Sequence, residues 1–421
     1  MLVEAVVVAG CAIVSDQPDS PDSEPPPTEP SRSAADRSRG RRHREERKWW
    51  GFAFAVLGWT ALVAAVGALI AGQFVRVDYY TEAPGDAVAV QPLVEIEGAP
   101  VYDDTEGQVY LLFVRRRDHI TLFRWLQAAL DPDIDAKSTD YDEPGSSPAD
   151  LDGASTSAMS VAQLAAKKLA LEKIGLEIEL LDGLEVASTI AGRPAATFLR
   201  AGDVILEVDG VVLDSERATD QFAATIREHD PGETVSITYE RDGERETVDI
   251  ETVDNGEGIA IIGVFPQPHL GFPIDIRFGG QIESIGGPSA GLAMTLALID
   301  DLTPGDLSGG LQVAVTGTID INGEVGEVGR VDLKAKAADR RGATLMLVPK
   351  CTEPSEPDAY ANRDGYAAAV DFFESCESEV AAAKRAVDRV VEVDTLDEAL
   401  AALEAAGGDP LPPVAAPATA P

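Results

Sequence analysis

Residues 286 to 291 read Gly-Gly-Pro-Ser-Ala-Gly, and Ser289 stands between Gly287 and Gly291. The same spacing satisfies Gly-x-Ser-x-Gly, the nucleophile elbow of α/β-hydrolases, in which an acid and then a histidine follow the serine along the chain. The last histidine here is His269, so no imidazole follows Ser289. The stretch therefore predicts a nucleophilic serine that uses another base, and lysine is the remaining candidate.

Lys334 and Lys336 compete for the role of base. A lysine accepts a proton only as a neutral amine, which requires surroundings that lower its pKa from about 10 toward neutrality. Residues 331 to 341 predict a helix that ends at Gly342. At roughly 100° per residue Lys334 shares a small apolar face of that helix, whereas Lys336 points away. Most helix lysines are solvated surface charges, but this pattern favours Lys334 as the base.

Three stretches within residues 271 to 349 resemble a known family. They read "IGGPSAGLAMTLALIDDLTPGDLSGG", "VAVTGTIDINGEVGEVGRV" and "LKAKAADRRGATLMLVP", and they closely resemble the proteolytic domain of the Lon family of Ser-Lys peptidases. The resemblance places Ser289 on the family's nucleophile, Lys334 on its catalytic lysine, and Thr316 on the threonine that orients that lysine. One pair departs from the family, which usually has Gly-Gly where this chain has Gly329-Arg330.

The resemblance implies an α+β fold, serine endopeptidase activity and a homo-oligomeric ring, expected to be a hexamer. Ser289 would attack the peptide carbonyl, and Lys334 would remove the hydroxyl proton, protonate the leaving amine and then activate water. Backbone amides of the glycine-rich turn around Ser289 are the expected oxyanion donors.

Residues 175 to 253 resemble a PDZ domain. The resemblance rests on an expected helix at 215 to 227 and on three short motifs: Gly183-Leu184-Glu185-Val186, Ala201-Gly202-Asp203-Val204-Ile205 and Val208-Asp209-Gly210. It implies a groove along residues 184 to 190 that accepts the carboxy terminus of a protein or peptide substrate as an added strand, with the carboxylate held by amides near residues 182 to 185. The alternative is a PDZ-shaped module that only packs on its neighbour, since a fold does not fix a function.

No charged residue occurs from Trp49 to Gln73, and the core of this stretch, 51 to 72, would span about 33 Å as a helix. The preceding "RSRGRRHREERKWW" is rich in arginine, so the positive-inside rule predicts a cytoplasmic amino terminus and places everything after residue 74 outside the cell. A buried core helix is disfavoured by the length, and a cleaved signal peptide by the leader of roughly 50 residues without an Ala-x-Ala site.

The expected domain organisation resembles the membrane-anchored, PDZ-containing Lon-like proteases of Gram-positive bacteria. Residues 131 to 156 are acidic and rich in Gly, Pro and Ser, which predicts a loop or linker, and a helix is expected at 160 to 174. The expected segments are a disordered cytoplasmic tail (1–48), a transmembrane helix (49–73), an extracytoplasmic α/β segment with a linker (74–174), a PDZ domain (175–253), a Lon-type protease domain (254–405) and a disordered tail (406–421).

Charge and motifs limit the ligands. With 73 acidic and 34 basic side chains the formal net charge is −39, so nucleic acid is not expected as a ligand. The sequence contains no Gly-x-x-x-x-Gly-Lys-Ser/Thr motif, and we expect cleavage without ATP and without a cofactor. No histidine follows Cys351 and Cys376, so neither a zinc site nor a catalytic cysteine is expected, whereas a disulfide between them fits an oxidising compartment.

Two alternatives to a Ser-Lys protease remain open. One is a noncatalytic PDZ adaptor in which the Lon-like domain is only an assembly platform. The other is an esterase that pairs Ser289 with the upstream His269. Replacement of Lys334 separates the three, because a protease loses turnover, an esterase keeps it and an adaptor has none.

Overall fold

The computed structural model describes residues 52, 54–67, 69–102, 106–139, 148–280, 282, 285–355 and 363–413. The chain divides into two units, Met1–Ala71 and Gly72–Pro421, which are described separately. The expected tail at 1 to 48, the basic segment before Trp49 and residues 414 to 421 lie outside the described residues.

The first unit contributes one apolar helix, Phe54–Gly72, which is long and apolar enough to cross a membrane by length and composition. Its large apolar side chains are exposed, with Trp59 at 69%.

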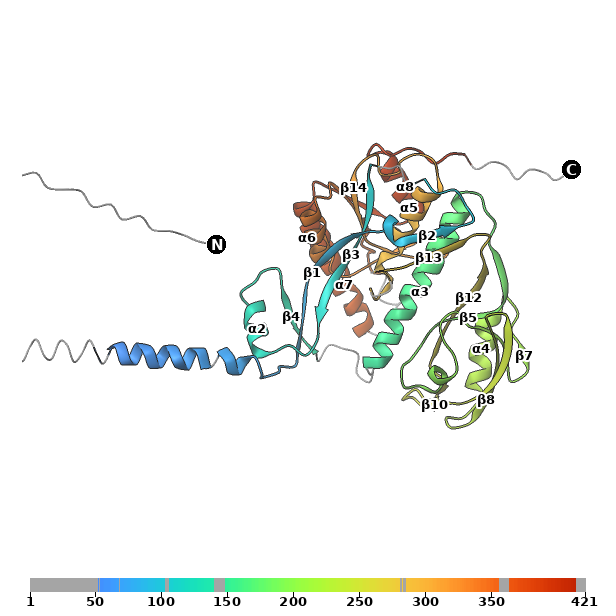
Figure 1. Cartoon of the computed structure of the whole chain (residues 1–421), viewed down its shortest axis with the longest axis horizontal. Coiled ribbons are helices and arrows are strands. Elements are labelled where there is room, and N and C mark those ends of the chain that lie inside the picture. The colour runs from blue at the N-terminus through green and yellow to red at the C-terminus, as the bar shows by residue number, and fades with distance from the viewer. Residues whose placement is uncertain are drawn as a thin grey trace, which may run out of the picture. The chain divides into compact units, whose positions relative to one another are not determined.

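The second unit is built around a six-stranded mixed sheet in the order β18-β17-β14-β3-β1-β4 (Figure 1). β3 pairs antiparallel with β1 and parallel with β14, and β17 continues the parallel part between β14 and β18. The strands are β1 (Tyr79–Ala89), β3 (Gln108–Arg117), β4 (Asp135–Ser138), β14 (Gln312–Val315), β17 (Leu345–Pro349) and β18 (Arg389–Val393).

Helices cover both faces of this sheet, and alternate strand residues enter two different cores. Leu345 packs with α3 (Pro148–Lys173), α5 (Gly291–Leu302) and α8 (Leu396–Glu404). Met346 packs with α6 (Val331–Arg341) and α7 (Arg363–Ala386) on the other face. All twelve residues of α5 are buried, so the helix that follows Ser289 is fixed inside the domain.

The remaining described elements of this domain are short. β13 pairs with β2 and β15 with β16, both antiparallel. These short elements are η1 (Gln91–Leu93), β2 (Val94–Glu97), α2 (Leu122–Ala128), β13 (Asp275–Phe278), η5 (Pro288–Ala290), β15 (Thr318–Ile319) and β16 (Val325–Gly326).

β1, β3 and β4, which precede the expected PDZ domain, belong to the same sheet as β14, β17 and β18, which follow it. Residues 74 to 174, expected as a separate segment, supply β1, β3, β4 and α3 to this sheet and its helical cover. The expected loop at 131 to 156 is also only partly a loop, because it contains β4 and the first turns of α3. Local sequence hides this start of α3, since its small residues are ordered by tertiary packing, as where Gly153 lies against Ile190, rather than by helix propensity.

The PDZ-like module lies between α3 and β13 in the chain and has its own apolar core. Its main sheet has the order β12-β5-β6-β8-β9, with β7 beside β6, and α4 (Ala218–Arg227) forms near the expected 215 to 227. A separate β10-β11 hairpin follows β9. The strands are β5 (Glu179–Thr189), β6 (Val204–Val208), β7 (Val211–Val212), β8 (Thr234–Arg241), β9 (Glu244–Glu251), β10 (Val253–Asp254), β11 (Ala260–Ile261) and β12 (Val264–Gly271), with η3 (Pro194–Thr197) between β5 and β6.

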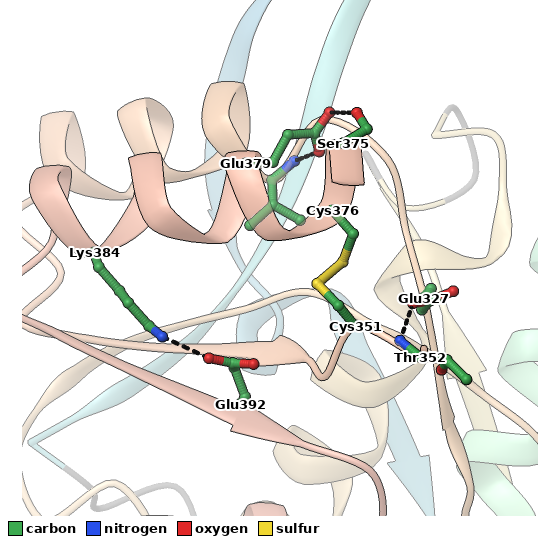
Figure 2. The surroundings of a disulfide bond; sticks show 9 residues. Glu327, Cys351, Thr352, Ser375, Cys376, Glu379, Lys384 and Glu392 are labelled. Atoms are coloured by element: carbon green, nitrogen blue, oxygen red, sulfur yellow. Dashed lines mark hydrogen bonds and ion pairs between the residues drawn. A yellow bond between two sulfur atoms is a disulfide. The ribbon is translucent and has the colours of Figure 1, made fainter. Parts of the chain in front are cut away.

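A disulfide joins Cys351 to Cys376, with their Cα atoms 5.8 Å apart (Figure 2). Cys351 lies two residues after β17, and Cys376 lies in the middle of α7. The pairing considered from the sequence is therefore present, and it ties α7 to the end of a central strand.

Candidate active site

Ser289 lies in the single turn η5, directly before the buried helix α5. Gly287 enters this turn with φ +86°, a conformation that L side chains rarely adopt. A Cβ on Gly291 would come within 3.0 Å of Ile319 Cγ2. The glycines around Ser289 are thus required by the turn and by close packing, and they leave the serine half-buried at the surface of a cavity.

Lys334 lies on the buried face of α6, and only 4% of it is exposed. Its Nζ donates a hydrogen bond to Thr316 Oγ1 at 3.0 Å. Lys336 points away and forms an ion pair with Asp133 at 2.9 Å. The predicted helix, its end at Gly342 with φ +82°, and the predicted orientation of both lysines are confirmed.

Thr316 connects the lysine to the serine turn. It follows β14, and its amide donates to the carbonyl of Leu347 in the neighbouring strand at 3.0 Å. Its hydroxyl accepts from Lys334 and donates to the backbone carbonyl of Ser289 at 3.4 Å. The next amide, of Gly317, donates to the same carbonyl at 3.0 Å. The structure therefore brings together all three residues singled out from the sequence.

Ser289 and Lys334 line one cavity of about 550 Å³. Both side chains are described, and no hydrogen bond joins them directly; such bonds often form only when substrate closes the site. Four consecutive residues of β3, Phe113 to Arg116, also line the cavity. Successive strand residues face opposite sides, so a cavity that touches all four runs along the edge of the strand. The pairing of β14 with β3 ends at Leu111, and within the described part of the chain no strand pairs with that edge beyond it, beside Ser289.

Burial lowers the pKa of Lys334 to about 8, and the nearby carboxylate of Glu379 acts in the opposite direction. Glu379 belongs to α7 and accepts a hydrogen bond from the amide of Val331 at 2.8 Å, which caps the first turn of α6. Burial raises the pKa of Glu379 as well. The amine is therefore partly neutral at mildly alkaline pH, as a general base must be.

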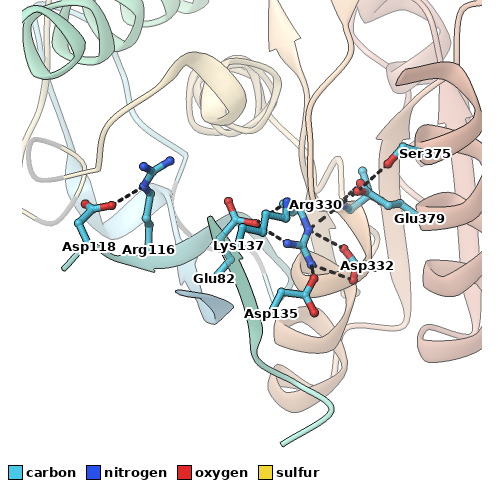
Figure 3. Close-up of polar contacts among 10 residues, drawn as sticks. Glu82, Arg116, Asp118, Asp135, Lys137, Arg330, Asp332, Ser375 and Glu379 are labelled. Atoms are coloured by element: carbon cyan, nitrogen blue, oxygen red, sulfur yellow. Dashed lines mark hydrogen bonds and ion pairs between the residues drawn. The ribbon is translucent and has the colours of Figure 1, made fainter. Parts of the chain in front are cut away.

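Arg330, which precedes α6, is a feature whose role sequence reasoning missed, although its departure from the family pattern was visible. Its backbone has φ +61°, in the left-handed region where glycine is the usual residue. Its guanidinium, 14% exposed, contacts four carboxylates, those of Glu82, Asp135, Asp332 and Glu379 (Figure 3). The left-handed turn that a Gly-Gly pair would form easily is here formed by an arginine with four acidic partners.

One amide of the glycine-rich turn, that of Gly287, is not free to donate to an oxyanion. The amide of Gly287 donates to the carbonyl of Ser155 on α3 at 3.1 Å, and it is therefore already satisfied. The amide of Ser289 lies in the first turn of a helix, where N–H groups lack intrahelical acceptors. Ser289 is the better donor in this turn.

The expected peptide groove along residues 184 to 190 is closed. β12 pairs with β5 along the edge opposite β6, as far as Thr189, so a strand of the chain itself occupies the edge to which a peptide would be added. Gly183, at the expected carboxylate site, already donates its amide to the carbonyl of Leu213. The sequence motif could not reveal that the groove is closed, because the paired residues of β5 and β12 are about 80 positions apart in the chain.

The outer edge of β12, which faces away from β5, has few backbone N–H groups that could donate to an added strand. The amide and carbonyl of Val186 both bond toward β6, so Pro266, its partner in β12, faces outward. Pro268 has the same orientation two residues later. Prolines on an outward edge remove ladder donors and protect edge strands from added strands.

Helix α3 touches both the PDZ-like module and the serine turn. Ser188 donates to the carbonyl of Gly153 at 3.0 Å, and Arg193 pairs with Asp150 at 3.1 Å. Two residues beyond Gly153, the carbonyl of Ser155 accepts a hydrogen bond from the amide of Gly287 in the serine turn. The first turns of α3 therefore connect the module to the candidate active site.

Within the described part of the chain, neither His269 nor a metal-binding cluster lies at the cavity of Ser289. His269 lies in β12, where its Nδ1 contacts the carbonyl of Asp182 at 2.8 Å, and it does not line the cavity of Ser289. Among the described residues, no group of three or more His, Cys, Asp or Glu is placed to hold a metal ion.

Comparisons with known proteins agree with this geometry. Residues 168–252 match the family model of the PDZ domain, and residues 279–359 match that of the Lon protease (S16) C-terminal proteolytic domain. The Lon protease of Clostridioides difficile (strain 630) is 47% identical over 64 residues, which is 15% of this chain and 8% of that protein. Lon protease 1 of Bacillus subtilis (strain 168) is 34% identical over 97 residues, 23% of this chain and 12% of that protein.

The chain thus spans about a tenth of the length of these curated relatives. The solved PDZ domain of an SdrC-like protein from Listeria monocytogenes is 33% identical, with 21% of this chain and 90% of that chain covered and a TM-score of 0.19. This chain therefore contains a PDZ domain and a Lon-type C-terminal proteolytic domain, and over the latter it is a homologue of Lon proteases.

Proposed function

We propose that this protein is a serine endopeptidase in which Ser289 is the nucleophile, Lys334 the general base and Thr316 the residue that orients the lysine. The observation that carries the proposal is the buried amine of Lys334, hydrogen-bonded to Thr316 in the cavity that Ser289 lines. A buried lysine amine without a carboxylate ion partner costs stability. A noncatalytic adaptor would gain nothing from keeping it.

In the proposed mechanism, neutral Lys334 takes the hydroxyl proton as Ser289 attacks the substrate carbonyl. The ammonium so formed protonates the leaving amine, and the neutral amine then activates water to hydrolyse the acyl-enzyme. The amide of Ser289 donates to the oxyanion. The substrate chain lies extended along the open edge of β3 at Phe113 to Arg116, where backbone hydrogen bonds hold it independently of its sequence.

We further propose that cleavage needs no ATP and that the active form is a homo-oligomeric ring, expected to be a hexamer. The absence of a P-loop motif from the 421 residues supports the first point. The likeness of the proteolytic domain to Lon proteases supports the second. Size-exclusion chromatography with light scattering tests the ring, and a strictly monomeric active enzyme would exclude it.

The PDZ domain is proposed to recruit or gate protein substrates, and the contacts favour gating. The expected groove is closed by β12, and the module instead contacts the helix that holds Gly287 in the serine turn. In this view the docked PDZ domain stabilises the turn through α3, and its release would loosen the turn.

The first prediction concerns the dyad. Ser289→Ala and Lys334→Ala should each nearly abolish cleavage of an unstructured protein by the residues after 74, and the double variant should be little worse because the two act as a unit. Lys336→Ala, the matched control on the same helix, should lose less than about twofold. Fragments are identified by mass spectrometry with and without ATP. An inactive Lys336→Ala, or an unaffected Lys334→Ala, would refute the assignment.

The second prediction concerns pH. Since the base works as a neutral amine and the pKa of Lys334 is about 8, cleavage should rise with pH and reach half its maximum near pH 8, then stay flat until the fold is lost. The initial rate on a short peptide between pH 5 and 10 measures it. An optimum below about pH 5, where a carboxylate base operates, contradicts the mechanism.

The third prediction concerns the PDZ domain. Amidation of a substrate's carboxy terminus should change cleavage by less than about twofold, because the carboxylate site at Gly183 is occupied. Arg193→Ala should slow cleavage even of a short peptide by about fivefold, the equivalent of one lost contact of roughly 1 kcal/mol. Arg245→Ala, which removes an exposed pair with Glu240 in the same module, serves as the control. If amidation of the substrate lowered the cleavage rate tenfold, the PDZ domain would instead be shown to recruit carboxy termini.

The fourth prediction concerns localisation. We propose a single-pass protein of the cell membrane, anchored by the helix Phe54–Gly72, with a cytoplasmic amino terminus and an extracytoplasmic protease domain. Protease added to intact spheroplasts should digest the residues after 74 and spare an amino-terminal tag. A protected carboxy-terminal part would overturn the orientation, and release of the chain by a high-salt wash would overturn the anchor.

A further inference from the structure

Arg330 is the centre of an ion cluster that joins four elements. Glu82 comes from β1, Asp135 from β4, Asp332 from α6 and Glu379 from α7. Asp332 lies 3.3 Å and Glu379 3.9 Å from Nε, and Glu82 and Asp135 contact the two terminal nitrogens (Figure 3). A planar guanidinium with five donors can serve this many carboxylates, whereas an ammonium cannot.

The cluster borders the amine of Lys334. Arg330 lies one helical turn before Lys334, its carbonyl accepts the amide of Lys334 at 3.1 Å, and both side chains line the same cavity. Glu379 acts on both residues: it contacts Arg330, and its charge favours the protonated form of Lys334. Glu379, one of the carboxylates that hold the arginine, is therefore also a carboxylate that attracts a proton to the lysine.

Without Arg330 the formal charge of the cluster would go from −2 to −3, because its charged groups are four carboxylates, Arg330 and Lys137. Four carboxylates face Arg330, and the other cation in the cluster is Lys137, which pairs with Glu82 at 3.0 Å. The remaining charged groups of the cavity are Asp86 on β1 and Arg115 and Arg116 on β3. Arg115 is paired with Asp86 and Arg116 with Asp118, so neither replaces the missing charge. Uncompensated carboxylates beside a buried amine stabilise its ammonium form.

We propose that Arg330 is a positioning residue that helps to keep Lys334 neutral, by offsetting part of the negative charge of Glu82, Asp135, Asp332 and Glu379 while it anchors the start of α6. The inference rests on the proposed role of Lys334 as the base. It also gives a reason for an arginine at a left-handed position that glycine would occupy without strain.

Arg330→Gly is the most informative variant, because glycine adopts φ +61° readily and so removes the charge without straining the turn. The pH of half-maximal peptide cleavage should rise by about one unit, so that the rate near neutral pH falls up to about tenfold while the high-pH plateau changes by less than about twofold. Arg330→Lys keeps the charge and should shift the midpoint by less than about half as much. Arg340→Gln, on α6 but paired with Asp133, which does not contact Arg330, should leave it unchanged.

A second readout does not depend on cleavage. Carbamylation of the Lys334 amine by cyanate, quantified by mass spectrometry as a function of pH, reports the neutral amine directly. Its midpoint should rise in Arg330→Gly in step with the activity midpoint. If the parent protein cleaves nothing, the proposed function fails, yet the carbamylation midpoints still decide the role of Arg330.

An unchanged midpoint in folded Arg330→Gly, with a lowered plateau, would show that Arg330 only shapes the turn and would overturn the proposal. Should Arg330→Gly fail to fold by circular dichroism, the comparison of Arg330→Gln with Arg330→Lys decides instead. Arg330→Gln should reach half-maximal cleavage at a higher pH than Arg330→Lys, and equal midpoints would refute the inference.

Discussion

The burial of one amine, that of Lys334, is the constraint on which the candidate site depends. Placing a lysine in the interior disfavours its charged form, and here the pKa falls from 10.5 to about 8. The unfolded chain therefore binds more protons than the folded one between those values. Stability rises with pH through that window, and below pH 8 the burial costs about 3 kcal/mol by linkage. A fold retains such a cost where chemistry needs a neutral amine.

Several elements keep this amine in place. β14 delivers Thr316 to it, the glycine turn brings the carbonyl of Ser289 to the same threonine, and α6 presents the lysine from the opposite face of the sheet. Helix α7 caps α6 through Glu379 and is itself tied to the end of β17 by Cys376, one turn earlier (Figure 2). Arg330 then offsets part of the negative charge of the carboxylates that this arrangement places nearby.

Sequence reasoning succeeds here where the signal is local and periodic. The helix from Val331 to Arg341, its end at Gly342 and the inward face of Lys334 follow from a period of 3.6 residues and one glycine. It fails where partners are distant in the chain. The pairing of β3 with β14, the closure of β5 by β12 and the four acidic partners of Arg330 join residues separated by up to about 250 positions, and no motif records them. The Gly-Gly to Gly329-Arg330 departure marked the position of the ion cluster without disclosing its partners.

The most direct test of the account is the titration of the Lys334 side chain itself. In a Ser289→Ala variant of the residues after 74, which cannot digest itself if the proposal holds, the Nζ and Cε resonances of isotopically labelled lysine can be followed by NMR, with Lys334→Met used to assign the signal. We expect one lysine signal that titrates near pH 8 and disappears in Lys334→Met. A Lys334 signal that titrates above about pH 10, as an exposed lysine does, would contradict the claim that this residue is the base.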